Sequence, residues 1–180
     1  DDWANYVKGV LYFTQQEGYK LPCGLNILIE GNIPNGAGLS SSASLEVLIG
    51  TILKELFQLP LSMLDIIKLS QKAENQFVGM NCGIMDQFII GMGKKGYAIA
   101  LDTATLKHSY VPVQLKQASI VIMNTRKQRG LTDSKYNERR AECEHALSQI
   151  QKIMKINSLC DLKEEEFEKI QHSITNPVER

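Results

Sequence analysis

Residues Ile33–Gly50 read IPNGAGLSSSASLEVLIG, a glycine- and serine-rich segment followed by the start of an apolar helix. A helix N-terminus carries backbone N–H groups without intrahelical partners and about half a unit of positive charge. Gly36 and Gly38 would allow tight turns and close approach by a ligand. The serines at 40–42 would add hydroxyl groups that bind phosphate oxygens or magnesium. Together these features predict a polyphosphate site.

Two common phosphate-binding motifs do not match this segment. The Walker A order G-x-x-x-x-G-K-[ST] is absent, and the dinucleotide fingerprint G-x-G-x-x-G fails because Ser41 stands where its last glycine belongs. A flexible loop with a serine N-cap is the alternative interpretation. The order GAGLSSSA before a well-patterned helix favours the phosphate site, because a cap needs one serine and not three.

Helices dominate the secondary structure predicted on either side of this segment. Apolar residues recur at helical spacing, and Ser62 with Asp65 forms a start like a capping box. Gly79 lies just past the end of the helix that follows. Thr132, Asp133 and Ser134 are predicted to cap a long charged helix. The predicted helices are a first one from about residue 3 to residues 15–18, then 42–57, 62–77, a short one near 85–88, 135–156 and 164–171.

Short β-branched and apolar stretches predict the strands. The predicted strands are 25–30, 97–101, 108–113 and 119–123. Because helices and strands mix without regular β-α-β alternation, the sequence favours the α+β class over a doubly wound sheet.

Two carboxylates have surroundings that favour a function. Glu74 lies near the C-terminal end of its helix, where the macrodipole disfavours an acid, so a compensating cation is expected. Magnesium would need only one carboxylate and one hydroxyl from the protein. Asp86 lies in an apolar segment and suits the carboxylate that a kinase places near its acceptor hydroxyl. The alternatives are a solvated glutamate and a helix-capping aspartate.

The composition is that of a globular protein without a strongly charged surface. Hydrophobic residues make up 43% of the 180 residues, and twenty basic residues balance twenty acidic ones. We therefore expect no nucleic-acid partner and no membrane partner. Four widely spaced cysteines favour reduced thiols in a cytoplasmic protein. The chain starts at Asp1 rather than Met, and both ends suggest an excerpt from a longer protein.

Three segments resemble the GHMP small-molecule kinases in their galactokinase form. PNGAGLSSSASLEVLIG, residues 34–50, is similar to the family's phosphate-binding motif. AENQFVGMNCGIMDQF, residues 73–88, is similar to the segment that carries a magnesium-binding glutamate and the catalytic aspartate. NTRKQRGLTDSKYNERRAECEHAL, residues 124–147, is similar to a later block whose tyrosine contacts the sugar. The segments stand in the family's order and span most of the chain.

The resemblance implies transfer of the γ-phosphoryl group of ATP to the C1 hydroxyl of D-galactose, giving α-D-galactose 1-phosphate. Ser42 and Glu74 would bind Mg²⁺, the implied cofactor. Asp86 would accept the proton of the hydroxyl or orient it. Gly83, through its backbone, and Tyr136, through its phenol, would contact the sugar. The implied ATP-binding residues are Gly36, Ala37, Gly38, Leu39, Ser40, Ser41 and Ser42.

The resemblance also implies a domain organisation. Residues 1–123 would form the ATP-binding N-terminal domain, of the ribosomal protein S5 domain 2-like fold and incomplete at its start. Residues 124–180 would begin a second, truncated α+β domain. The family's N-terminal arginine and acidic-histidine cluster, and its later glycine-rich motif, are not in the sequence.

The expected partners are galactose and ATP, and the expected state is a monomer. The isolated 180 residues would lack half of the sugar contacts, so catalysis is expected of a longer protein.

Three other functions stay open on the sequence. A kinase of the same family could act on a related sugar such as N-acetylgalactosamine. A non-catalytic sensor of galactose and ATP would be expected to lose residues of the glycine- and serine-rich segment 36–42, here called the serine loop. Ser42 and Asp86 are both present. An inert α+β domain would not be stabilised by nucleotide, whereas a ligand at a hundred times its dissociation constant adds about 2.7 kcal/mol.

Overall fold

The computed structural model describes residues 3–34, 37–124 and 135–180. They belong to two compact units, which divide between residues 131 and 132, and each unit has a hydrophobic core. The expected division at residues 123 and 124, and the assignment of each side to a kinase domain, stay predictions. Among the described helices, none combines the length and the apolar character that crossing a bilayer requires.

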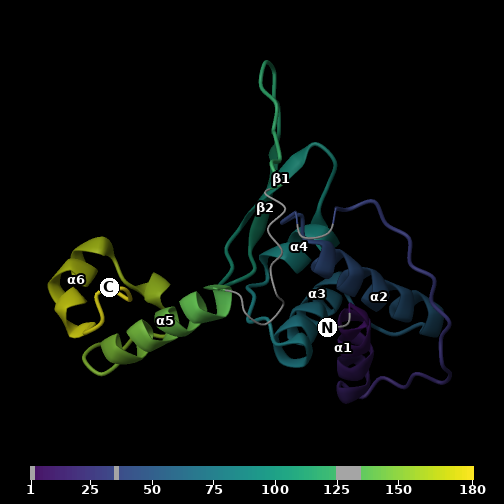
Figure 1. Cartoon of the computed structure of the whole chain (residues 1–180), viewed down its shortest axis with the longest axis horizontal. Helices are drawn as coiled ribbons and strands as arrows, with labels where there is room; N and C mark the ends of the chain where they lie inside the picture. Colours follow the sequence, from purple (N-terminus) through teal and green to yellow (C-terminus); the bar gives the residue numbers. More distant parts are fainter. Residues whose placement is uncertain (1–2, 35–36, 125–134) are drawn as a thin grey trace. The chain divides into compact units, whose positions relative to one another are not determined.

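Helices form most of the first unit up to residue 92, as the sequence predicts (Figure 1). Each begins or ends within a few residues of its predicted bounds, because caps and apolar spacing are local signals. The confirmed helices are α1 (Ala4–Gln16), α2 (Ser41–Phe57), α3 (Met63–Ala73) and α4 (Met85–Met92).

The predicted capping box starts α3. The Ser62 hydroxyl accepts a hydrogen bond from the Asp65 N–H at 3.2 Å, and the Asp65 carboxylate accepts one from the Ser62 N–H at 2.8 Å. The predicted extension to residue 77 is present as a π-helix, η1 (Glu74–Val78). Gly79 ends it with a φ of +90°, a left-handed conformation that glycine adopts without strain. Single-turn π-helices occur often at functional sites.

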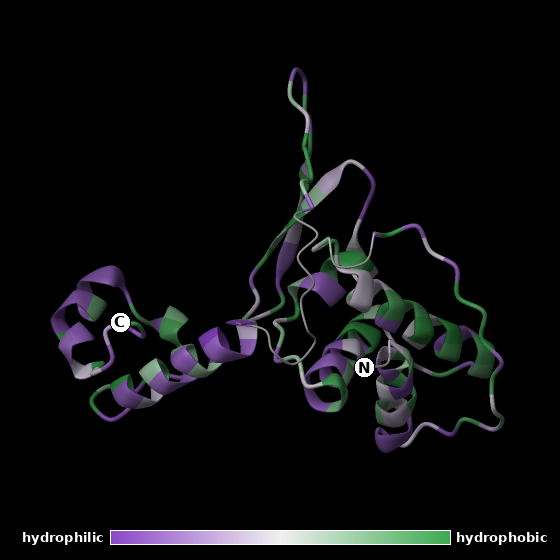
Figure 2. Ribbon diagram, in the orientation of Figure 1, coloured by the Kyte–Doolittle hydropathy of each residue, from purple (hydrophilic) through white to green (hydrophobic). Residues whose placement is uncertain are grey.

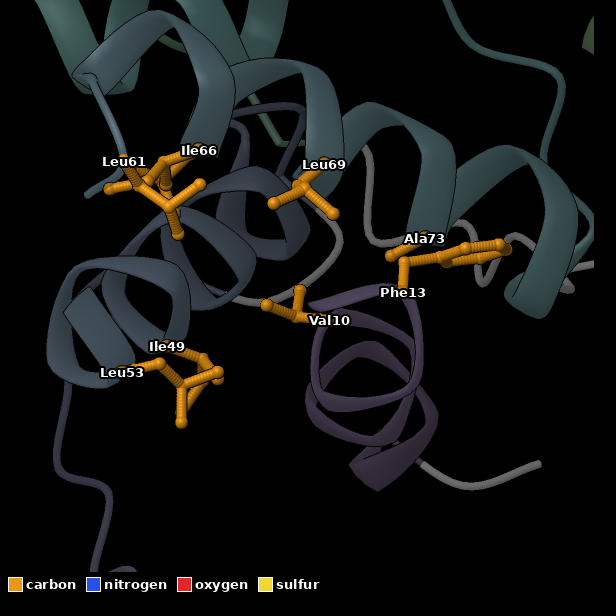
Figure 3. Packing of buried hydrophobic residues seen from close by; sticks show 9 residues of the cluster. Val10, Phe13, Ile49, Leu53, Leu61, Ile66, Leu69 and Ala73 are labelled. Carbon is orange, nitrogen blue, oxygen red and sulfur yellow. The ribbon is translucent and has the colours of Figure 1, made fainter. Parts of the chain in front are cut away.

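The core of the first unit lies between α1, α2 and α3 (Figure 3). Gly50 on α2 allows α3 to approach closely, because a Cβ atom at Gly50 would lie only 2.6 Å from Cγ2 of Ile66. The serine loop leads into α2, and α3 continues into η1, which begins at Glu74. The contact between α2 and α3 therefore helps to fix the position of the serine loop relative to Glu74. The buried core residues are Val10, Phe13, Val47, Ile49, Leu53, Leu61, Ile66, Leu69 and Ala73.

An antiparallel hairpin follows the helices, made of β1 (Tyr97–Leu101) and β2 (His108–Pro112). Both strands lie where the sequence predicts them. The Tyr110 hydroxyl donates to the carbonyl of Met92 at 2.7 Å, which ties the hairpin to the end of α4. Ile99 and Leu101 pack against a second small core that includes Phe88 of α4.

The predictions of strands at 25–30 and 119–123 are wrong. In the described residues, the β-sheet contains only β1 and β2, and neither of these two stretches pairs with another strand. Leu28 is 97% exposed and Met123 is 86% exposed, although both stretches are apolar (Figure 2). A strand requires a neighbour that accepts and donates its backbone hydrogen bonds, so β-propensity alone does not create one.

The second unit contains α5 (Lys135–Ile150), η2 (Leu159–Asp161), α6 (Glu164–Ile170) and η3 (Gln171–Ser173). Its core gathers Ala146, Ile150 and Ile174. The prediction that α5 continues to residue 156 is wrong, because the helix ends at Ile150 and a turn follows, in which Ile153 is exposed. The predicted helix at 164–171 is confirmed as α6. The predicted cap at residues 132–134 lies outside the described residues.

Candidate functional site

The serine loop enters α2 through left-handed backbone. Gly38 has a φ of +73°, and a Cβ atom placed there would meet no other atom within 4 Å. Ser40, at the N-cap of α2, has a φ of +56° and makes no side-chain capping bond, so the simple interpretation as a serine N-cap is not supported at this residue. Ala37 and Leu39 lie in the same loop, whereas Gly36 lies outside the described residues. A non-glycine residue in this conformation often marks a functional loop.

Ser42 and Glu74, the two predicted magnesium ligands, are brought together. The Ser42 side chain lies close enough to the Glu74 carboxyl to lower its pKa. Glu74, the first residue of η1, is 6% exposed. Burial raises the pKa of Glu74, and hydrogen bonds from Ser42, Cys82 and Glu46 oppose this shift. A hydroxyl and a carboxylate side by side are oxygen donors that suit a hard cation such as Mg²⁺.

Glu46 is a third acid at this site, which was not predicted from the sequence. It lies on α2 four residues after Ser42, on the same helix face, and none of its surface is exposed. Burial, followed by the charge of Glu74, raises the pKa of Glu46 to about 9. The Gln87 amide donates to Glu46 and to Glu74. An acid inside the apolar run from 45 to 53 was the available sequence signal.

Glu46 should make the stability of the protein depend on pH. A carboxyl with a raised pKa in the folded state stabilises the fold fully below its unfolded pKa, near 4.5, and this contribution is lost as the pH rises through about 9. The limiting slope for one proton is about 1.4 kcal/mol per pH unit. The Glu46→Gln side chain cannot ionise. We therefore expect the urea concentration at the midpoint of unfolding to fall less between pH 5 and pH 9 for Glu46→Gln than for the unchanged protein.

The control for this pH prediction is Glu55→Gln, which changes an exposed glutamate on the same helix. Its pH profile should follow that of the unchanged protein. Parallel profiles for Glu46→Gln and Glu55→Gln would contradict a buried, protonated Glu46. The measurement is made without divalent metal, so that only protons are exchanged.

Asp86 lies in the first turn of α4 and is partly exposed. Its charge contributes to raising the pKa of Glu74, so the two carboxylates lie close enough to interact. The carbonyl of Cys82 accepts hydrogen bonds from Gln71 and Asn75, each at 3.2 Å, which fixes the chain beside Gly83. Gly83 itself is exposed just ahead of α4.

Tyr136 lies on α5 in the second unit and is 50% exposed. Because the two units are described separately, its predicted sugar contact stays a prediction. In the described residues, no group of three or more His, Cys, Asp or Glu side chains is arranged to hold a metal. A cation at Ser42 and Glu74 would therefore take its other ligands from water and from a bound phosphate, as Mg²⁺ commonly does.

The comparisons with known proteins define the class. Residues 5–94 match the family described as the GHMP kinases N terminal domain, and the chain belongs to this kinase family. The chain is 59% identical to the galactokinase of Clostridium beijerinckii, over 98% of the chain and 46% of that protein. It is 58% identical to the galactokinase of Staphylococcus saprophyticus over 98% of the chain and 46% of that protein. It therefore spans about half the length of these curated relatives.

A solved structure gives the same result for the fold. The chain is similar to Lactococcus lactis galactokinase complexed with galactose, with a TM-score of 0.93 and 48% identity, over 99% of the chain and 46% of that structure. The resemblance found in the sequence and the α+β, GHMP-kinase fold are thus both confirmed.

Proposed function

We propose that a full-length protein carrying this chain is a galactokinase, which transfers the γ-phosphoryl group of ATP to the C1 hydroxyl of D-galactose. The observation that carries the proposal is the match of nearly the whole chain to galactokinases at 48–59% identity. The contact of Ser42 with Glu74, and the interaction of Asp86 with Glu74, support it from the site. The product would be α-D-galactose 1-phosphate.

Each residue of the site would then have a role that fits its surroundings. The loop from Gly36 to Ser42 would hold the ATP phosphates with backbone N–H groups at the start of α2. Ser42 and Glu74 would hold Mg²⁺, which neutralises phosphate charge when it is bound with ATP. Asp86 would accept the proton of the sugar hydroxyl, or orient that hydroxyl in line with the phosphoryl group.

Two further residues would contact the sugar. Gly83, exposed in the turn before α4, would offer its backbone to the sugar. Tyr136, on α5, would contact the sugar through its phenol. We also propose that the full-length protein is a monomer in the cytoplasm. Its chain would divide into an ATP-binding domain and a second domain.

The proposal is tested by measuring ADP release from the full-length protein with ATP, Mg²⁺ and either galactose or N-acetylgalactosamine. We expect release that depends on galactose, and a phosphorus NMR signal of a sugar phosphate at the anomeric carbon. A clear preference for N-acetylgalactosamine would replace the proposed substrate. Binding of both ligands without turnover would indicate a sensor, and would contradict the proposed catalysis.

A further inference from the structure

Gln87 joins three elements of the first unit through one buried amide group. It is the third residue of α4, follows Asp86 directly, and has no exposed surface. Its Nε2 donates to Oε2 of Glu74 at 2.5 Å and to Oε2 of Glu46 at 3.1 Å. The amide therefore connects α4 with η1, which carries Glu74, and with α2, which carries Glu46.

The orientation of this amide is set by the two acids. Oε1 of Gln87 is buried and has no hydrogen-bond partner among the described residues. A buried oxygen without a partner is destabilising, so stability alone does not explain this residue. Rotating the amide by half a turn would set Oε1 against the Glu74 carboxylate oxygen and leave Nε2 without an acceptor. Gln87 thus acts at this position as a donor.

The Glu74 carboxylate is approached by side chains from different elements. The Gln87 amide donates to it from α4, and Ser42, at the start of α2, lies close enough to lower its pKa. Only one peptide bond separates Gln87 from Asp86. The hydrogen bond to Glu74 therefore restricts the position of the Asp86 backbone relative to the Glu74 carboxylate.

We propose that Gln87 is a positioning residue, whose buried amide holds the Glu74 carboxylate beside Ser42 and at a fixed distance from Asp86. This inference rests on the proposed kinase function, in which Glu74 binds Mg²⁺ and Asp86 faces the acceptor. Partners that orient a metal ligand typically change metal affinity or activity by about 10–100-fold when they are replaced. Glu46, the second acceptor, is bound by the same Nε2 atom.

The test uses a full-length protein that carries this chain and a non-hydrolysable ATP analogue, AMP-PNP. Its dissociation constant is measured by calorimetry with Mg²⁺ and with EDTA, and galactose phosphorylation is measured in parallel. Gln87→Met keeps the size of the side chain and removes the donor. We expect the gain in AMP-PNP affinity on adding Mg²⁺ to shrink by about 10–100-fold, the affinity in EDTA to change less than about twofold, and kcat to fall.

Phe88→Leu is the matched control, because it alters the next buried residue of α4 in the neighbouring core without changing a hydrogen bond. Its Mg²⁺-dependent gain should equal that of the unchanged protein. Gln87→Asn, which keeps an amide but shortens the side chain by one methylene, provides the same test if Gln87→Met does not fold. A full gain in a folded Gln87 variant, or an equal loss in Phe88→Leu, would overturn the inference.

The two proposals fail in different ways. An unchanged protein that shows neither Mg²⁺-dependent AMP-PNP binding nor galactose phosphorylation would reject the proposed function, and the positioning role with it. An unchanged protein that shows both, together with a Gln87→Met variant that retains the whole gain, would reject the positioning role alone.

Discussion

Replacing Asp86 by alanine should lower the turnover number of a full-length protein carrying this chain by about 10²–10⁴-fold. Asp86 is partly exposed at the start of α4 and acts on Glu74 through its charge, so it can face an acceptor hydroxyl near a Mg²⁺-bound phosphate. The ATP phosphates are assigned to the serine loop instead. We therefore expect the dissociation constant for ATP, measured by calorimetry without sugar, to change far less than kcat.

Asp102→Asn is the control for this prediction. Asp102 accepts hydrogen bonds from Ala104 and Thr105 in the turn between β1 and β2, outside the proposed site. Its replacement should leave kcat and ATP binding within about twofold of the unchanged values. If Asp86→Ala lost turnover and ATP affinity equally while the fold stayed intact, the assigned role would be refuted.

The largest effect on stability is expected where α2 crosses α3. Ile66→Ala removes a fully buried side chain and should cost about 2–5 kcal/mol. Gly50→Ala adds a methyl group 2.6 Å from Cγ2 of Ile66 and should cost about 1–3 kcal/mol. In the double variant, Cγ2 of residue 66 is absent, and the methyl group added at position 50 occupies part of the vacated space. The free energy of unfolding should therefore fall by less than the sum of the single changes.

Urea unfolding of the three variants gives the coupling energy directly. A matched control replaces Ile67, which is also fully buried on α3 but lies against Gly91 of α4. Gly50→Ala combined with Ile67→Ala should be additive within about 0.5 kcal/mol. Additivity in the Gly50 and Ile66 pair as well would show that the two helices separate to accommodate the added methyl group.

Of the candidate site, the sequence provided the loop and two acids, and the structure provided their arrangement. Ser42, Glu74 and Asp86 could be named because they lie in segments with helix starts, an unfavourable macrodipole or a family resemblance. The contact of Ser42 with Glu74 follows from the packing of α2 and α3, which brings together residues 32 positions apart. Glu46 and Gln87 were missed because neither residue type suggests burial on its own.

Local sequence was enough to specify the helices, the capping box and the two strands of the hairpin. These features depend on residues a few positions apart, so short-range caps and apolar spacing predict them. Tertiary packing selects which apolar stretches become strands, as residues 25–30 and 119–123 demonstrate, and where α5 ends. It also brings Glu46, Glu74 and Gln87 into one buried cluster. Strand pairing and burial both require partners that are distant in sequence, and no local pattern specifies them.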